Sequence, residues 1–284
     1  MSESDIVLPR IEEGAAIPRI IHQTFPTKDL PPALLANADR LRSDNPGWDY
    51  RLYDDLDIEA LILGHYGSGI LAEYRRIDPS YGAARADLFR YLLMYAVGGV
   101  YLDIKSSSHR PLDRLREVGA RFLLARWDNQ AGGRHPNWGL HPELEPFGAG
   151  EFQQWHIVCA PGHPFLRAVL ERVLNNIAAY RPWVNGVGRD GVIRLTGPIA
   201  YTLAIAPLIG RHDCRLFADE RGLGLDYSVV PGTSHKQLFR KHYVNNTASV
   251  VRMQGIKRPV AAAYSLGKRL RGTLGRAKAR LGAS

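Results

Sequence analysis

The chain has 284 residues, 45% of them hydrophobic and 23% charged, which favours a globular protein with a sizeable core in one large domain or two small ones. We expect neither a membrane span nor a signal peptide, because no stretch approaches ~20 uninterrupted apolar residues and the opening lacks a basic-then-apolar order. The net charge of +9 lies at the C-terminal end, where twelve Lys or Arg and no acid follow Asp226. The remaining 25 bases face 28 acids, so the body is near neutral and we expect no nucleic-acid binding.

The first 55 residues predict a strand, a helix and a second strand. Residues 17–25 form a short apolar, β-branched run that is typical of a buried parallel strand. Apolar residues recur at helical spacing over 31–43, and residues 48–55 alternate in the manner of a strand. This order predicts a βαβ unit with a right-handed crossover, and it favours an α/β protein.

Two helices and a strand are expected next. Residues 56–76 have helical spacing with a break near "YGSG", and a stronger helical pattern runs from 81 to 97. Gly98 and Gly99 end that helix, as glycines at helix C-termini do, and "VYLDI" from Val100 predicts a strand.

The second half adds predicted strands at 121–127, 155–160 and 214–217 and predicted helices at 161–180 and 196–208. The last helix opens on "TGP", where Thr196 is a plausible cap, and residues 186–191 indicate a turn. Residues 128–150 exceed the ~12 to 15 residues of a typical structureless connection. We expect this segment to be an active-site loop or to hold short elements of its own.

Two pairs of opposite charges stand out. Asp87 and Arg90 are three residues apart on a predicted helix and share one face, although an ordinary intrahelical ion pair would give the same pattern. Asp103 and Lys105 end a predicted strand, and strand alternation would send both to one side, where open α/β sheets bind ligands. A surface ion pair is the alternative for this second pair.

Asp103 and Lys105 offer different chemistry at that edge. A carboxylate accepts hydrogen bonds from ribose or sugar hydroxyls, or binds a hard cation. The Lys105 ammonium does neither, but it offers a fixed positive charge to a diphosphate.

Several segments together resemble glycosyltransferase family 32 over about residues 17–250: "IPRIIHQTF", "NPGWDYRLYDD", "ARADLFRYLLMYAVGGVYLDIKS", "CAPGHPFL" and "TGP". The central block, with Asp87, Arg90, the two glycines, Tyr101 and Asp103 at fixed spacing, is the specific part of this resemblance. The resemblance implies a GT-A-like, Rossmann-like α/β fold that forms a single nucleotide-sugar-binding domain with a central mixed, mostly parallel sheet. It also implies a nucleotide diphosphate sugar as donor and retention of the anomeric configuration.

The resemblance further implies which residues contact the donor nucleotide. His22 and Gln23 would lie under the base and ribose, and Tyr101 would belong to the donor site. The family often brings a late histidine near the diphosphate, for which His242 and, less strongly, His235 are candidates. The tryptophan expected after that histidine is absent, so a surface or core role for His242 stays open.

The catalytic assignments that the resemblance implies are Asp87, Arg90, Asp103 and Lys105. Asp87 and Arg90 would hold the donor sugar, and Asp103 matches the first acid of the Asp-x-Asp signature, which usually binds a divalent ion. Lys105 occupies the position of the second acid, so a requirement for Mn²⁺ or Mg²⁺ at Asp103 is open. The ammonium could replace part of the metal's charge, or the missing acid could leave a sugar-nucleotide binder without turnover.

The acceptor site is expected within residues 128–156, which are rich in tryptophan and amide side chains. Flat apolar faces beside amides suit sugar rings, but the tryptophans could equally anchor a long loop to the core. We therefore expect a glycan or glycolipid acceptor, without assigning a residue to it.

The basic end of the chain predicts a separate extension at 251–284, after a domain that covers 15–250. Apolar residues recur there every three or four positions between basic side chains: Leu266, Leu270, Leu274, Ala277 and Leu281. This pattern is typical of an amphipathic helix on an anionic membrane, although a solvated tail is equally compatible with it. The spacing of Cys159 and Cys214 does not fit a metal site, and we expect both to be reduced thiols. We expect a cytoplasmic protein, peripheral on the inner face of the membrane if the tail binds lipid.

The sequence thus predicts a retaining transferase that moves mannose, galactose or glucose to a glycan or glycolipid, in the synthesis of an envelope or capsular polysaccharide. The rival hypothesis is a non-catalytic sugar-nucleotide or glycan-binding protein, for which Lys105 is the main reason.

Overall fold

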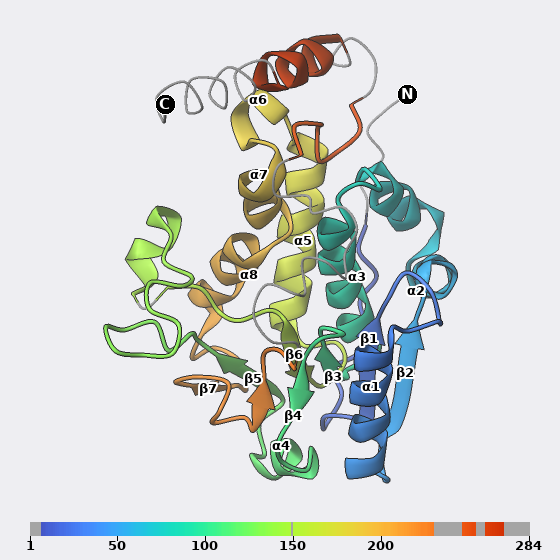
Figure 1. Cartoon of the computed structure of the whole chain (residues 1–284), viewed down its shortest axis with the longest axis vertical. Helices are drawn as coiled ribbons and strands as arrows, with labels where there is room; N and C mark the ends of the chain where they lie inside the picture. The colour runs from blue at the N-terminus through green and yellow to red at the C-terminus, as the bar shows by residue number, and fades with distance from the viewer. Residues whose placement is uncertain (1–6, 149, 230–245, 254–258, 270–284) are drawn as a thin grey trace, which may run out of the picture.

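The computed structural model describes residues 7–148, 150–229, 246–253 and 259–269. A six-stranded sheet in the order β2-β1-β3-β6-β5-β7 forms its centre, and a two-stranded sheet pairs β4 with β8 (Figure 1). The strands are β1 Ile20–Thr24, β2 Asp49–Tyr53, β3 Gly99–Leu102, β4 Ser107–Ser108, β5 Phe122–Ala125, β6 His156–Cys159, β7 Arg215–Phe217 and β8 Leu225–Asp226. In the central sheet β6 pairs antiparallel with both neighbours, while the other pairings are parallel. The predicted α/β class with a mixed, mostly parallel sheet is confirmed.

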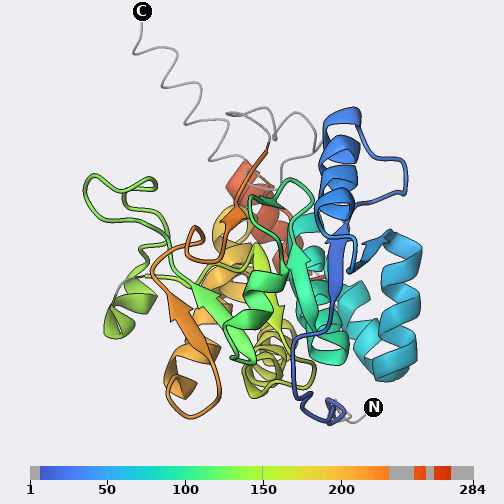
Figure 2. The same cartoon turned by 90° about the horizontal axis from the view of Figure 1, so that it is seen from below.

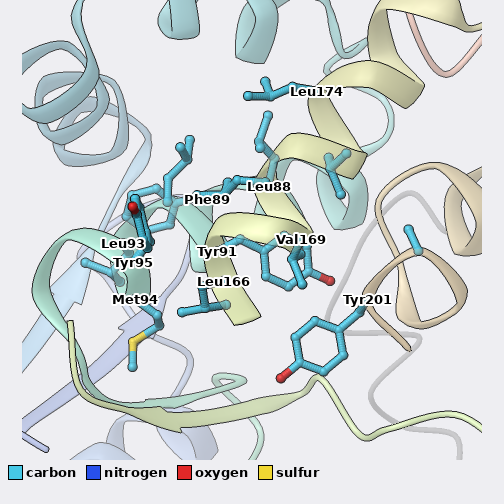
Figure 3. Close-up of a cluster of buried hydrophobic side chains, with 14 of the residues drawn as sticks. Leu88, Phe89, Tyr91, Leu93, Met94, Tyr95, Leu166, Val169, Leu174 and Tyr201 are labelled. Carbon is cyan, nitrogen blue, oxygen red and sulfur yellow. The ribbon is translucent and has the colours of Figure 1, made fainter. Parts of the chain in front are cut away.

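Helices cover both faces of the sheet. They are α1 Pro32–Asp44, α2 Asp55–Arg76, α3 Gly82–Val97, α4 Asp113–Glu117, α5 Pro164–Ala179, α6 Pro182–Asn185, α7 Gly188–Leu195 and α8 Pro198–Ile205, with the short 3₁₀ turns η1 Pro142–Phe147 and η2 Ala206–Leu208. The larger apolar cluster joins α2, α3, α5, α7 and α8 to one face, and a second cluster joins α1 and α4 to the other. Figure 3 shows part of the first cluster, where Tyr91 of α3 and Tyr201 of α8 lie among leucine and valine side chains.

Strand β3 shows how sequence alternation divides its side chains between the two faces. Val100 and Leu102 belong to the cluster beside α1 and α4, whereas Tyr101 belongs to the cluster beside α3. Strands β1 and β3 are parallel neighbours with His22 opposite Tyr101, so their carboxyl ends meet at one edge of the sheet. The residues after β1 and β3 are thereby brought together.

The glycine pair after α3 has the role that the sequence predicts. Gly98 and Gly99 have φ angles of 66° and 106°, in the region that favours glycine. A Cβ atom at Gly98 would lie 2.5 Å from the backbone nitrogen of Pro161, so a side chain there would also clash. The pair therefore ends α3 and allows the chain to enter β3 directly.

Three local predictions are wrong. Strand β3 ends at Leu102, and residues 103–106 form a turn in which the Ser106 amide donates to the Asp103 carbonyl at 2.7 Å. Strand alternation therefore does not set the directions of the Asp103 and Lys105 side chains. Residues 186–191 lead into helix α7 instead of forming only a turn. Gly197, not Thr196, caps α8.

The loop at 128–150 holds a short element of its own, as one of the two alternatives predicts. The 3₁₀ turn η1 lies within it, and Figures 1 and 2 show the segment reaching outward beyond β5. Its stem is tied to the body at the Arg126–Phe152 bridge, because these residues pair as in an antiparallel ladder. The loop is therefore anchored at its base beside the sheet edge.

A long apolar segment runs through α7, α8 and η2. Gly188–Leu208 is 21 residues long and apolar enough to cross a membrane by length and composition, although Arg189, Asp190 and Arg194 keep it from being an uninterrupted apolar run. In the structure 61% of its apolar window is buried, and it is divided between α7, α8 and η2. Its apolar character is thus used in packing against α5 and α3.

The packed body extends slightly past the predicted limits of 15 and 250. Leu8 is 5% exposed and joins the main core cluster. Val251 is fully buried and pairs with Ile77 as an isolated bridge, and Ala261 of the helix at 259–269 is 5% exposed. The described part of the extension therefore contacts the body.

Candidate active site

A charged cluster lies where α3 faces the end of β3. Arg90 of α3 stands between two carboxylates: its Nη2 is 3.3 Å from Asp87 Oδ1 and 3.1 Å from Asp103 Oδ1. Arg90 is 6% exposed and Asp87 4%, whereas the Asp103 side chain keeps 27% of its surface. The structure thus joins three of the four predicted catalytic residues, and Asp103 is the member that reaches solvent.

Asp87 is held by side chains from two distant segments and by Arg90 of its own helix. Thr196 Oγ1 donates to its Oδ2 at 3.0 Å, and Gln154 Nε2 donates to its Oδ1 at 3.3 Å. Burial raises the pKa of the Asp87 carboxyl, and the Arg90 charge and the Thr196 hydrogen bond oppose that rise. The carboxylate is therefore fixed in position with both oxygens engaged.

Arg90 is oriented by bonds beyond its two ion pairs. Its Nη1 donates to the Gln154 carbonyl at 2.8 Å, and its guanidinium carbon lies 5.0 Å from the centre of the Tyr101 ring. Burial is the largest single influence and lowers the pKa of the guanidinium, but Asp103, Tyr101 and Asp87 together outweigh it, so the pKa is raised. Arg90 stays charged and links α3 to the start of β6.

Tyr101 lies at the floor of this cluster. Its hydroxyl lies 3.2 Å from Thr24 Oγ1 and 3.4 Å from Asp103 Oδ1, and its ring is 1% exposed. Burial raises the pKa of Tyr101 to about 12, so the hydroxyl keeps its proton and can donate to Asp103. Tyr101, which was predicted to belong to the donor site, therefore supports Asp103 through a hydrogen bond from its buried hydroxyl.

His22 and Gln23 do not face the ligand side, contrary to the expectation that they lie against the nucleotide. Both side chains are fully buried. The His22 ring nitrogens lie 3.0 Å from the Tyr53 hydroxyl and 2.9 Å from the Gly98 carbonyl oxygen, and burial lowers the pKa of the imidazole to about 4. A neutral, doubly bonded histidine supports the junction of α3 and β3 and has no ring nitrogen left for a ligand.

Gln23 serves the turn that carries Asp103. Its amide nitrogen donates to the Asp103 carbonyl at 3.1 Å, and its carbonyl oxygen accepts from the Tyr50 hydroxyl at 2.8 Å. The side chain thus fixes the backbone of Asp103 from β1, which is a positioning role. The prediction of a direct contact with the ribose has no support from this geometry.

Lys105 lies apart from the carboxylate cluster. Its ammonium is 3.9 Å from the centre of the Tyr227 ring, and its carbonyl oxygen accepts from the Val229 amide at 2.8 Å. The sequence left open a surface ion pair between Asp103 and Lys105. That pair is not formed, since Asp103 pairs with Arg90 instead. His242 and His235 lie outside the described residues.

Two site residues were missed by the sequence reasoning. Gln154 lies in the segment expected to hold the acceptor, and Thr196 opens the "TGP" segment, yet both bind Asp87. Neither has a neighbour in the sequence that would indicate this contact, since Gln154 is 67 residues and Thr196 109 residues from Asp87. Only the packing of α3, β6 and α8 brings them together.

The residues present do not form a ready divalent-metal site. No cluster of three or more His, Cys, Asp or Glu side chains suited to a metal occurs among the described residues. Both oxygens of Asp87 are engaged, and Asp103 already has a guanidinium at 3.1 Å. A pair of carboxylates in such a site would be neutralised by a metal ion, whereas Asp87 and Asp103 are paired with the Arg90 guanidinium.

Part of the chain, about a third of its length, matches a known family model. Residues 31–120 match the family model described as a glycosyltransferase sugar-binding region containing a DXD motif. An initiation-specific alpha-1,6-mannosyltransferase of Schizosaccharomyces pombe is 28% identical over 203 residues, which cover 67% of this chain and 48% of that protein. Inositol phosphoceramide mannosyltransferase 3 of the same organism is 34% identical over 103 residues, covering 36% of this chain and 28% of the relative. The chain thus spans about half or less of these relatives' length.

Solved structures show weaker similarity. The PaToxG glycosyltransferase is 15% identical with a TM-score of 0.43, over 89% of this chain and 87% of that one. The UDP-bound glycosyltransferase domain of the YGT toxin is 10% identical with a TM-score of 0.43, over 82% of this chain and 90% of that one. The family model and the curated relatives support a glycosyltransferase family 32-like assignment, in agreement with the resemblance in the sequence.

Proposed function

We propose, from this glycosyltransferase family 32-like assignment, that the protein transfers a hexosyl group from a nucleotide diphosphate sugar to a glycan or glycolipid acceptor. The observation that carries the proposal is the Asp87–Arg90–Asp103 cluster at the end of β3, inside the segment that matches the sugar-binding region. Mannose is the first sugar to test because the curated relatives above are named as mannosyltransferases, and galactose and glucose follow.

We propose transfer with retention, which the resemblance in the sequence implies, and without a covalent intermediate at Asp87. A covalent route needs a carboxylate free to attack the anomeric carbon. Asp87 has both oxygens engaged by Thr196, Gln154 and Arg90, and it is 4% exposed. We therefore assign Asp87 to holding the site and Asp103 to hydrogen bonds with donor hydroxyls, while the acceptor hydroxyl attacks on the face that the diphosphate leaves.

The proposal is tested by release of the nucleoside diphosphate from UDP- and GDP-linked mannose, galactose and glucose, with Mn²⁺ and with EDTA. We expect turnover of at least one donor, and a product whose anomeric configuration by NMR matches the donor. Saturable binding without turnover under any condition, including with acceptor extracts, would favour the rival sugar-nucleotide-binding protein. Neither binding nor turnover would reject both.

An aromatic cluster beside the site supports a sugar acceptor. The Trp127 ring centre is 5.2 Å from that of Trp138 and 5.1 Å from that of Tyr227, and Trp138 lies 4.6 Å from His135. Trp127 is 8% exposed, whereas Trp138 is 45% exposed. The buried ring thus anchors the loop, and the exposed ring presents a rigid flat face. We propose that Trp138 stacks on a sugar of the acceptor.

Replacing Trp138 with Ala should lower the rate of transfer to the acceptor about 3- to 10-fold, because one ring contact is lost. Hydrolysis of the donor by water should stay unchanged, since water needs no stacking surface. Trp183→Ala is the matched control, because Trp183 is also exposed, at 38%, and lies on α6. Equal loss of both reactions in the Trp138 variant would show that the ring serves the fold and not the acceptor.

Contact of the C-terminal extension with an anionic membrane stays a prediction, as does a position on the inner face of the membrane. The helix at 259–269 presents Val260 and Leu266, 52% and 58% exposed, beside basic side chains. Most of the predicted amphipathic pattern lies outside the described residues. Co-sedimentation of the full chain with anionic and neutral vesicles would test it, and equal recovery with both would exclude it.

A further inference from the structure

The turn after β3 is held rigidly by a second segment of the chain. The Val229 amide donates to the Lys105 carbonyl at 2.8 Å, and Ser106 Oγ donates to the Tyr227 carbonyl at 2.7 Å. Immediately beyond the turn, β4 pairs antiparallel with β8, with Ser107 opposite Asp226. The backbone of Lys105 is thus fixed from both sides by residues 225–229, and its side chain begins from a defined place.

The Lys105 ammonium lies over a supported aromatic ring. Its Nζ is 3.9 Å from the centre of Tyr227, and the Tyr227 ring centre is 5.1 Å from Trp127 and 5.5 Å from Trp155. By contrast, Lys28 has its ammonium bound to the Asp57 carboxylate. A ring attracts an ammonium without neutralising it, so Lys105 keeps its positive charge for an anion.

Asp103, two residues before Lys105, is already paired with a cationic side chain. Arg90 Nη2 lies 3.1 Å from Asp103 Oδ1, and the Tyr101 hydroxyl lies 3.4 Å from the same oxygen. A divalent ion at Asp103 would have to approach this guanidinium, with one carboxylate where the DXD motif has two. The local charges therefore disfavour a metal and favour an anion.

We infer that the Lys105 ammonium, positioned by the Tyr227 ring, takes the place of the divalent cation at the diphosphate, so that the protein transfers sugar without a bound metal. The inference rests on the proposed function and concerns the same site. Arg90 then orients Asp103, while Lys105 supplies the charge at the leaving group. Tyr227 acts through Lys105 and is a positioning residue.

The transfer step is balanced without a metal. The bond between the anomeric carbon and the diphosphate oxygen breaks, and its electron pair leaves with the diphosphate. The acceptor hydroxyl oxygen bonds to the same carbon, and its proton passes to the departing phosphate oxygen. The ammonium of Lys105 stabilises the negative charge that grows on the diphosphate, which is the contribution that a metal would otherwise make.

The test measures donor turnover, and separately UDP and GDP binding by calorimetry, in EDTA and in Mn²⁺. For the wild-type chain we expect rate and affinity to agree within about twofold between the two conditions. Lys105→Ala should lose about 10²- to 10³-fold in turnover in both conditions, because one stabilising cation is removed. Lys105→Asp should be as slow in EDTA and should recover in Mn²⁺ by at least tenfold, since it restores the second acid of the motif.

Two further variants separate the charge from the fold. Tyr227→Phe keeps the ring and should retain wild-type turnover, whereas Tyr227→Leu should lose roughly 2- to 30-fold, the range of a cation–π contact. Arg172→Met removes an exposed charge on α5 and should change neither turnover nor binding. Equal turnover in Tyr227→Phe and Tyr227→Leu would remove the ring from the inference.

The possible results distinguish this inference from the proposed function. Turnover that EDTA abolishes and Mn²⁺ restores in the wild-type chain would overturn the metal-free inference while leaving the transferase intact. Absence of turnover in every condition would overturn the proposed transferase function. The binding measurements would then decide the inference about Lys105. A nucleotide affinity that requires Mn²⁺, or one that Lys105→Ala leaves unchanged, would reject the inference.

Discussion

The Asp103→Asn variant should lose at least about 100-fold in donor turnover at neutral pH, because its charge and acceptor oxygens are the exposed part of the cluster. Asn keeps the shape and one oxygen for Arg90, and Arg90 still has Asp87 as a partner. The free energy of unfolding should therefore fall by less than about 2 kcal/mol. Turnover and urea unfolding of the same preparation measure the two effects together.

Asp113→Asn is the control for this experiment. Asp113 is a carboxylate on α4 whose side chain is 50% exposed and pairs with Arg19 at the surface. Its loss should change both turnover and stability very little, because surface ion pairs contribute about 0–1 kcal/mol. An unchanged turnover in Asp103→Asn would remove Asp103 from the site and with it the assignment of the DXD position.

The second large effect is expected at Arg90. Replacing Arg90 with Met should lower the free energy of unfolding by about 3–5 kcal/mol at neutral pH, because the buried Asp87 carboxylate loses its charged partner. Turnover should also fall, since Asp103 loses the guanidinium that orients it. Arg75→Met is the control: Arg75 is a solvent-exposed partner of Glu59, and its loss should change the free energy of unfolding very little.

The stability loss in Arg90→Met should depend on pH in a defined direction. The pKa of Asp87 is already raised in the folded protein by burial, and removing Arg90 takes away a charge that lowers it. A carboxyl whose folded pKa lies above its unfolded value binds protons more tightly when folded, so its contribution to stability falls as pH rises between the two values. The loss should therefore be full above the raised pKa and shrink as pH falls toward the ordinary aspartate range.

Urea unfolding of Arg90→Met and wild type at pH 5 and pH 8 checks this sign. A further Asp87→Asn change in the Arg90→Met background should recover part of the stability at pH 8, because the unpaired charge is then absent. If Arg90→Met lowered the free energy of unfolding equally at both pH values, the cause would not be an unpaired charge on Asp87.

The sequence by itself predicted the elements that depend on local patterns. The helix now seen at Gly82–Val97 follows from apolar spacing, and its end follows from Gly98 and Gly99, where the backbone has positive φ angles. The strand–helix–strand order at the N-terminus likewise needs only neighbours in the chain. Asp87 and Arg90 could be placed on one face for the same reason, because three residues span nearly one helical turn.

The directions of side chains beyond regular elements were decided only by the tertiary structure. Strand alternation fails for Lys105 because the chain turns at Asp103, and the lysine is placed by Val229 and Tyr227, more than 120 residues later in the chain. The antiparallel direction of β6 and the hydrogen-bond partners of His22 also have no local signal. Such features depend on which distant segments fill the space around a residue.

For the candidate site, the charged residues could be identified from the sequence, but their hydrogen-bond partners could not. The resemblance in the sequence pointed to Asp87, Arg90 and Asp103, and helix geometry placed the first two on one face. The partners that hold Asp87, Gln154 and Thr196, come from segments 67 and 109 residues away. A hydrogen bond needs atoms about 3 Å apart, and sequence patterns fix distances of that kind only within one element. The sequence therefore determined the charged groups of this protein, and the packing of α3, β6 and α8 decided their geometry.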